Sequence, residues 1–232
     1  MRFPVTTLPR TRTISVRARP DVDHHHLDAR IRAHLGGAGR CPEDGRRSTH
    51  VLLFDDSASV VGYQGTDPAG RRYEETAIAV DLLGHACRCG RELVGVVHFD
   101  VGPADVAPTA VATRPGLVAV HEALRVPDDG AGVSTIGPAL AVAAGFPGPL
   151  TTLVILSDFA LTDTDVVTDL LASRPAWVDH VHVVSLGVVP SFTGGVVPPW
   201  VTVTKLGHRP GQVAEAVHRS FTRTRLPSRR TS

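Results

Sequence analysis

The sequence predicts a doubly wound α/β fold, in which a mostly parallel central sheet carries helices on both faces. Two observations support this fold class. Runs rich in Val, Leu and Ile alternate along the chain with longer amphipathic segments, as strands alternate with helices in such folds. The first run, Val51–Phe54, is apolar at every position, which is typical of a strand buried on both faces of a parallel sheet.

The strands and helices follow from these runs and from the turn-forming residues between them. Val51–Phe54 ends at Asp55, and a polar loop with glycine separates it from an amphipathic helix at Tyr73–Cys89. Thr135 stands before the alanine-rich helix at Ile136–Ala144 and is available as its N-cap. The expected strands are Val51–Phe54, Leu93–Phe99, Val106–Val111, Leu150–Leu156, His180–Leu186 and Trp200–Leu206. The expected helices are Tyr73–Cys89, Leu117–Leu124, Ile136–Ala144, Asp163–Leu171 and Gln212–Arg223.

The domain that these elements form is expected to span residues 48–223. Residues 1–47 are interpreted as an N-terminal extension with an edge strand at Thr13–Ala18, a short helix at His24–Leu35 and a linker rich in Gly and Arg. Residues 224–232 are polar and basic, and we expect a disordered tail there. The length of 232 residues suits one α/β domain with such an extension.

The composition is that of a globular protein with a packed core. Hydrophobic residues make up 42% and charged residues 20% of the chain, and both values are ordinary. No run approaches the ~18 apolar residues that span a membrane, and the N-terminus lacks the apolar stretch of a secretory signal. We therefore expect a cytoplasmic protein without a membrane partner. The three cysteines, Cys41, Cys87 and Cys89, show neither a disulfide framework nor zinc-site spacing.

The net charge of +1 hides an acidic middle between two basic ends. Residues 1–49 carry ten Arg against five acidic residues, and residues 50–204 carry seven Arg against seventeen. Residues 205–232 carry seven basic residues against one acidic residue. Basic ends can contact the acidic body, an acidic partner or nucleic acid. Because neither end interleaves aromatic residues with its arginines, we favour contact with the body, and nucleic acid is not an expected partner.

Acidic and hydroxyl side chains follow strands that should end at one edge of the sheet, where the ligands of open α/β sheets collect. Asp55 begins the turn Asp55-Asp56-Ser57-Ala58-Ser59, and Asp158 follows the strand at Leu150–Leu156. If the turn stays roughly extended, the side chains of Asp55, Ser57 and Ser59 face the same point.

A third loop, Gly132–Pro138, adds the hydroxyls of Ser134 and Thr135 just ahead of a helix. Hard oxygen ligands of this kind suit Mg²⁺, Mn²⁺ or Ca²⁺, and Mg²⁺ seeks about six oxygens while keeping some waters. Two carboxylates with hydroxyls leave such an ion short of ligands, so a carboxylate from a partner protein can complete its coordination. The sequence therefore predicts a divalent-cation site that binds a protein.

The same segments resemble those of von Willebrand factor A domains, over about residues 48–223. Val51–Ser59 is similar to the family's first strand and its Asp-x-Ser-x-Ser motif, the metal-ion-dependent adhesion site (MIDAS). Ser134–Leu140 is similar to the family's Thr-Asp-Ile-Gly-Pro-Ala-Leu segment, and Leu153–Asp158 to the strand that ends in Thr-Asp-Gly. Because the three matches follow in the family's order, the resemblance is more specific than one Asp-x-Ser-x-Ser motif alone.

The resemblance implies a Rossmann-like von Willebrand factor A fold and a set of metal ligands. The implied ligands are Asp55, Ser57 and Ser59 from the first loop, Asp158 from the strand end, and Ser134 or Thr135 from the third loop. It also implies a non-enzymatic bacterial domain that grips a partner's Glu or Asp through Mg²⁺, or through Mn²⁺ or Ca²⁺. Because many bacterial members work beside AAA+ ATPases or in stress and defence systems, the expected partner is a component of that kind.

Two residues depart from the family pattern. Asp56 adds a second carboxylate to the first loop, either as a supporting group or as one that raises the affinity for the cation. Phe159 stands where the family has Gly, and a bulky residue there can change the turn that presents Asp158. The alternative that Phe159 favours is a structural scaffold with a degenerate metal site.

Other interpretations compete with a metal site. Asp55, Ser134 or Thr135 can each cap the helix that follows it. An Asp after the first strand also begins phosphoester hydrolases of the haloacid dehalogenase type, but these place a second Asp where this chain has Ser57. The sequence contains no Gly-x-Ser-x-Gly elbow, P-loop or His-Glu-x-x-His motif, so an enzyme is the weaker alternative. Among the histidines, His98 stands at a strand end near the predicted site.

Overall fold

The computed structural model describes residues 47–223, except for residues 87, 100–103, 128–133, 193–194 and 208. The strand at 13–18, the helix at 24–35 and the tail at 224–232 that the sequence predicts lie outside the described residues. The strands are β1 (Ser48–Phe54), β2 (Glu92–His98), β3 (Val106–Ala110), β4 (Thr152–Ser157), β5 (Val181–Ser185) and β6 (Val201–Lys205). The helices are α2 (Ala58–Val61), α3 (Arg71–Ala86), α4 (Arg114–Ala123), α5 (Gly137–Ala144), α6 (Thr164–Ala172) and α7 (Gln212–Thr222).

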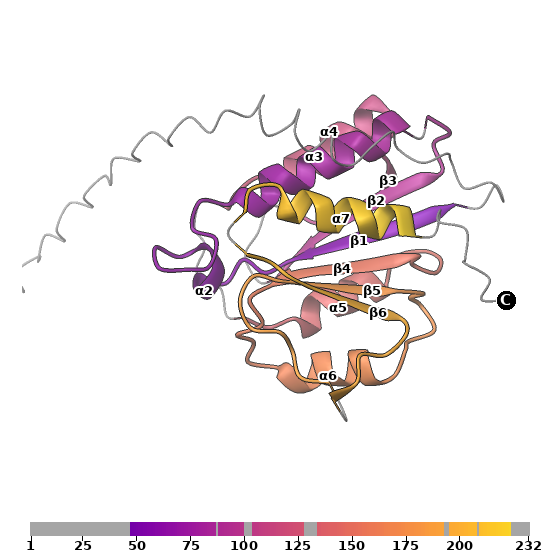
Figure 1. The fold of residues 1–232 in the computed structure, drawn as a ribbon. Coiled ribbons are helices and arrows are strands. Elements are labelled where there is room, and N and C mark those ends of the chain that lie inside the picture. Colours follow the sequence, from indigo (N-terminus) through magenta and orange to yellow (C-terminus); the bar gives the residue numbers. More distant parts are fainter. Residues whose placement is uncertain are drawn as a thin grey trace, which may run out of the picture.

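The described strands form one six-stranded sheet in the order β3-β2-β1-β4-β5-β6 (Figure 1). All neighbouring pairs are parallel except β2 and β3, which are antiparallel. The strand order reverses between β1 and β4, and Phe54 at the end of β1 pairs with Leu156 of β4. Because ligands of such sheets bind beyond the carboxyl ends of the strands at this reversal, the residues that follow β1 and β4 are placed for a site.

Helices cover both faces of the sheet. α3, α4 and α7 pack on one face, and α5 and α6 pack on the other (Figure 1). Along β1, Leu52 and Phe54 belong to the first apolar core, and Val51 and Leu53 belong to the second. Burial on both faces is the reason why this strand shows no apolar–polar alternation. Of the helices that the structure describes, none is both long enough and apolar enough to cross a membrane.

Two of the differences from the predicted set lie beside the first ligand loop. β1 begins at Ser48, three residues before the predicted start, because the polar residues Ser48, Thr49 and His50 are buried and paired with β2. α2 is absent from the predicted set, since its four residues are too few to show a helical period. Both differences arise next to the strand that carries the first predicted ligand loop.

A buried histidine of β5 lies against α7. His182 on β5 is 1% exposed. Its Nδ1 contacts the Ser220 hydroxyl, and its Nε2 lies 2.9 Å from the Thr204 hydroxyl. Because the Ser220 hydroxyl already donates to the Ala216 carbonyl at 3.0 Å, it accepts from Nδ1, and Nε2 accepts from Thr204. Burial, together with nearby cationic side chains, lowers the pKa of His182 from 6.5 to about 3.

We expect His182 to make the fold sensitive to acid. Between pH 6.5 and about 3, the unfolded chain binds a proton at this residue that the native protein does not bind, so stability falls as the pH decreases. The loss is about 1.4 kcal/mol per pH unit below 6.5. His182→Gln, which keeps a donor and an acceptor, should lose about 2 kcal/mol less unfolding free energy than the wild type between pH 7 and pH 5 in urea denaturation. Equal losses in the two proteins would contradict this role.

Candidate metal centre

Asp55 is the first residue after β1, and it is fully buried. Its amide donates to the Leu156 carbonyl of β4 at 3.0 Å, which attaches the start of the loop to the neighbouring strand. Its Oδ1 accepts from the Ser57 amide at 3.0 Å, and its Oδ2 accepts from the Ser157 hydroxyl at 2.5 Å. The carboxylate is therefore held by both strands at the reversal of strand order.

Burial raises the pKa of Asp55 above its ordinary value of 3.8. The hydroxyl of Ser157 and the hydroxyl and amide of Ser57 oppose this rise by hydrogen bonding, and the negative charge of Asp158 adds to it. The influence of Asp158 indicates that the two predicted acidic ligands lie close in space. A neighbouring cation would favour the ionised form of Asp55 and so oppose the effect of burial.

Ser57 and Ser59 lie together, although not in the predicted extended turn. Ser57 is extended, with φ −64° and ψ 157°, and is the N-cap of α2. Ser59 lies inside α2, because the amides of Val60 and Val61 bond to the Ser57 carbonyl and close a helical turn. The two hydroxyl oxygens are 2.9 Å apart. Ser57 is buried and Ser59 is exposed, so the hydroxyl pair leads from the core to the surface.

Asp158 follows β4 and is 5% exposed. Its Oδ1 accepts from the Ala160 amide at 3.0 Å, and its carbonyl accepts from the Val188 amide at 3.1 Å. Phe159 has a φ of 59°, the left-handed conformation that favours glycine. Its ring is buried in the apolar core on the face that α5 and α6 cover. Phe159 thus adopts the backbone conformation that the family's glycine permits, and Asp158 stays near Asp55.

Ser134 is attached to the loop that follows Asp158. Its carbonyl accepts from the Thr162 amide at 2.8 Å and from the Thr162 hydroxyl at 3.0 Å. Its own hydroxyl is buried and has no hydrogen-bond partner among the residues that the structure describes. A buried polar atom without a protein partner marks a place for a water molecule or an ion.

Thr135 does not cap the following helix, and that prediction is wrong. α5 begins at Gly137, with Ile136 as its N-cap. The carboxylate of Asp163, the residue before α6, accepts from the Ile136 amide at 3.0 Å and from the Gly137 amide at 2.8 Å. A charged acceptor at a helix start is favoured over a neutral hydroxyl, so the cap comes from another loop. The side chain of Thr135 is half-buried beside Ser134.

The structure brings some of the predicted ligands into contact. The Asp55 carboxylate accepts from the Ser57 amide, and the hydroxyls of Ser57 and Ser59 lie together. Asp158 influences Asp55 by its charge, and Ser134 is bonded to Thr162 in the loop that follows Asp158. Within the described ranges, no group of three or more His, Cys, Asp or Glu side chains is arranged to hold a metal ion. The predicted centre has a different composition, because hydroxyl oxygens accompany only two carboxylates.

A buried network of charged and polar side chains lies behind the first loop, and it was not part of the predicted site. We call it the Arg72 network; its members are Asp56, Asp67, Arg72, Tyr73 and His98. The Asp56 Oδ1 accepts from Arg72 at 3.1 Å and from the Tyr73 hydroxyl, and its Oδ2 lies 2.5 Å from the His98 Nδ1. Both carboxylate oxygens of Asp56 are engaged by the protein. These bonds tie Asp56 to α3 and to β2.

His98, the last residue of β2, connects the network to α4. Its Nε2 lies 2.9 Å from the Ala123 carbonyl. Because a carbonyl oxygen can only accept, Nε2 carries a proton. The contact between Nδ1 and Asp56 then requires a second proton on one of these two groups. The sequence indicated His98 as a residue near the site, and the structure shows that its partner there is Asp56.

Arg72 carries a signal in the sequence that was not used. It precedes Thr76, Ala79 and Leu83 at intervals of four, seven and eleven residues, and all four are buried on α3. An arginine in register with the buried face of an amphipathic helix must have a buried partner. Helical spacing alone could therefore have identified Arg72 as a structural or functional residue.

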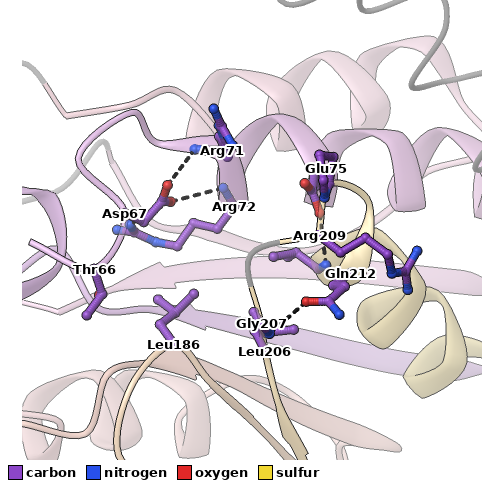
Figure 2. A pocket seen from close by; sticks show the side chains of 12 residues that line it. Thr66, Asp67, Arg71, Arg72, Glu75, Leu186, Leu206, Gly207, Arg209 and Gln212 are labelled. Atoms are coloured by element: carbon purple, nitrogen blue, oxygen red, sulfur yellow. Dashed lines mark hydrogen bonds and ion pairs between the residues drawn. The ribbon is translucent and has the colours of Figure 1, made fainter.

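A pocket of about 150 Å³ lies beside the network, between the N-terminal ends of α3 and α7 (Figure 2). Helix N-termini can bind phosphate through free amides. Here the Asp67 carboxylate accepts from the first two amides of α3 at 2.9 and 3.0 Å, and the Glu75 carboxylate accepts from the amides of Gly211 and Val213 at 2.9 Å each. Because the protein's own carboxylates occupy both helix starts, the pocket does not favour a phosphate group.

Solved structures with similar folds include proximal thread matrix protein 1 from the mussel byssus, with a TM-score of 0.50 and 16% identity over 79% of this chain and 49% of its own. A von Willebrand factor type A protein from Catenulispora acidiphila has a TM-score of 0.49 and 14% identity, over 77% of this chain and 43% of its own. In another structure of the mussel protein, with a TM-score of 0.47 and 16% identity over 79% of this chain and 49% of its own, zinc occupies the MIDAS motif of that protein.

In these three comparisons the chain spans less than half of the other protein's length. No protein-family model matches the sequence, and no curated protein sequence matches it. At identities this low the likeness concerns the fold alone. The six-stranded, mostly parallel sheet with flanking helices is a doubly wound α/β fold, and the predicted fold class is confirmed.

Proposed function

We propose that this chain is a protein-interaction domain that holds a divalent cation, Mg²⁺ or alternatively Mn²⁺ or Ca²⁺, and catalyses no reaction. One observation carries the proposal. The Ser134 hydroxyl is buried and has no hydrogen-bond partner among the described residues. The carbonyl of the same residue is bonded to Thr162, in the loop that follows Asp158. A cation beside the hydroxyl would give this oxygen the partner that its burial otherwise denies it.

The residues of the centre fit such a cation. Carboxylate and hydroxyl oxygens are the ligands that Mg²⁺ and Ca²⁺ prefer. The raised pKa of Asp55 marks a carboxylate that would gain from a neighbouring positive charge. The proposed ligands are Asp55, Ser57, Ser59, Asp158, and Ser134 or Thr135.

The two carboxylates balance the charge of a divalent ion without filling its coordination sphere. A Glu or Asp side chain of a partner protein would take an open position, and a component that works with an AAA+ ATPase or in a stress or defence system is the partner class we favour. The exposed Ser59 lies on the surface side of the site. Tyr63, just after α2, is 96% exposed, and aromatic side chains of this kind are enriched at protein interfaces.

Ser134→Ala tests the proposal because its two expected effects differ in sign. In EDTA, removal of a buried hydroxyl without a partner should leave the free energy of unfolding unchanged or raise it by about 1 kcal/mol. In excess Mg²⁺ the variant should lose most of the wild-type stabilisation, which is about 2.7 kcal/mol at a hundredfold excess over Kd. Thermal and urea unfolding under both conditions measure the two effects.

Thr152→Val is the matched control. Thr152 begins β4, at the opposite end of that strand from Asp158, and its buried hydroxyl also lacks a partner in the part of the chain that the structure describes. In EDTA, Thr152→Val should change the free energy of unfolding as Ser134→Ala does. In Mg²⁺ it should be stabilised as much as the wild type. A wild type that gains no stability from millimolar Mg²⁺, Mn²⁺ or Ca²⁺ would contradict the metal centre. A full response in Ser134→Ala would remove Ser134 from the ligand set.

A further inference from the structure

Arg72 contacts the first ligand loop from its buried side. The residue is 0% exposed and lies at the start of α3. Its Nη2 donates to the Asp55 carbonyl at 2.8 Å and to the Asp56 carboxylate at 3.1 Å. Its Nη1 donates to Asp67 at 3.2 Å, and Asp67 also accepts from the Arg72 amide at 3.0 Å (Figure 2). One guanidinium group thereby fixes the main chain of Asp55 relative to α3.

The two acidic residues of the loop have separate sets of partners. The Asp55 carboxylate accepts from the Ser57 amide and from the Ser157 hydroxyl. The Asp56 carboxylate is bonded within the Arg72 network. Because the two carboxylates bond to different groups, holding Asp56 in the Arg72 network keeps it apart from Asp55, which is left to Ser57 and Ser157.

We propose that Arg72 is a positioning residue for the metal centre. By bonding the Asp55 carbonyl and the Asp56 carboxylate, it holds the loop in the conformation in which Asp55 and Ser57 bind the cation. This inference rests on the proposed function, because it assigns a role within the same site. Ordering the loop in advance lowers the entropy that must be lost when the cation binds.

The charge of Arg72 makes the proposal testable by the sign of one effect. Its guanidinium group is a positive charge behind a cation site, and it opposes cation binding by Coulomb repulsion. If charge were its main influence, removing it would strengthen metal binding. If Arg72 positions the loop, removing it weakens metal binding in spite of the favourable change in charge. A purely structural role would lower the stability of the fold and leave the metal affinity of the folded molecules unchanged.

The experiment is calorimetric titration of the folded full-length proteins with Mn²⁺. Arg71→Gln is the matched control, because it removes the same charge from the adjacent, exposed side chain. We expect Arg72→Gln to raise Kd at least tenfold, Arg72→Lys to raise it less, and Arg71→Gln to leave it unchanged or lower it. A Kd for Arg72→Gln equal to or below that of the wild type would overturn the proposal.

Tyr73→Phe serves if Arg72→Gln does not fold. It removes the hydroxyl that donates to Asp56 without changing any charge, and it keeps the ring that stacks on Phe54 at a centroid distance of 4.8 Å. We expect a severalfold rise in the Kd for Mn²⁺. A Kd equal to that of the wild type would argue against positioning by the network.

Hydrogen exchange of the metal-free proteins separates this proposal from the metal site itself. The amides of Asp55, Val60 and Val61 are hydrogen-bonded within the loop or to β4, and they report on the order of the loop. Residues 55–61 should exchange faster in Arg72→Gln than in the wild type, and at the wild-type rate in Arg71→Gln. If the wild type bound no Mn²⁺, the proposed function would be contradicted. The positioning role of Arg72 would then be tested by hydrogen exchange alone. Equal exchange in Arg72→Gln and the wild type would then exclude positioning.

Discussion

Asp55→Asn is expected to stabilise the metal-free protein and to abolish its response to Mg²⁺. Without a cation, burial and the charge of Asp158 raise the pKa of Asp55 above 3.8. The native state then binds a proton at Asp55 more tightly than the unfolded chain does. The free energy of unfolding therefore falls as the pH rises from 3.8 through the raised pKa. This loss of stability remains at neutral pH. Asparagine cannot ionise and removes the loss, while its oxygen can still accept from the Ser57 amide.

In excess Mg²⁺ the wild type should be more stable than Asp55→Asn, the reverse of the order in EDTA. The wild type gains about 2.7 kcal/mol at a hundredfold excess of Mg²⁺ over Kd, whereas Asp55→Asn gains nothing. Urea unfolding at neutral pH, in EDTA and in Mg²⁺, measures both parts of the prediction. A variant less stable than the wild type in EDTA would contradict the effect of burial on Asp55. A variant that keeps the Mg²⁺ response would remove Asp55 from the ligand set.

Phe159→Gly is expected to cost more stability than any relief of backbone strain can return. A non-glycine residue at the left-handed φ of 59° loses about 1–2 kcal/mol, which glycine would recover. The Phe159 ring is 8% exposed within the core on the α5 and α6 face, and removing a buried aromatic side chain costs about 3–5 kcal/mol. The net destabilisation should be about 1–4 kcal/mol in urea unfolding.

The Mg²⁺ response of Phe159→Gly should equal that of the wild type, because glycine adopts the same φ and keeps the turn that presents Asp158. Phe159→Leu is a useful companion, since it retains the strained φ and part of the buried volume and should be destabilised less. A glycine variant more stable than the wild type would mean that the ring contributes little to the core. A lost Mg²⁺ response would mean that the ring itself supports Asp158.

The sheet and its ligand edge could be predicted because they depend on local properties of the chain. A strand such as Val51–Phe54 is recognisable from its own residues, since burial on both faces requires apolar side chains throughout. Asp55 and Asp158 each follow such a strand directly, so placing both at the carboxyl edge required no knowledge of distant contacts. The similarity of three ordered segments to one family supplied the rest of the proposed ligand set.

The supporting contacts could not be predicted, because they join residues that no spacing rule connects. Asp56 contacts Arg72, which is 16 positions away in the sequence, and His98, which is 42 positions away. Both contacts depend on the packing of α3 and β2 around β1. The hydroxyl of Thr135 is a good local signal for a helix cap, yet Asp163, 27 positions after Ile136, takes that role. Local propensity names a candidate, and tertiary packing decides which group is used.

The reversal of strand order between β1 and β4 also bears on how the chain is assembled during synthesis. The strands on one side of this seam come from residues 48–110 and those on the other side from residues 152–205, so the ribosome releases the sheet as two successive halves. The hydrogen bond between Asp55 and Ser157 crosses the seam and joins residues 102 positions apart. Pairing over such separations forms later than local structure. A cation at the seam would therefore bind only after both halves of the sheet have joined.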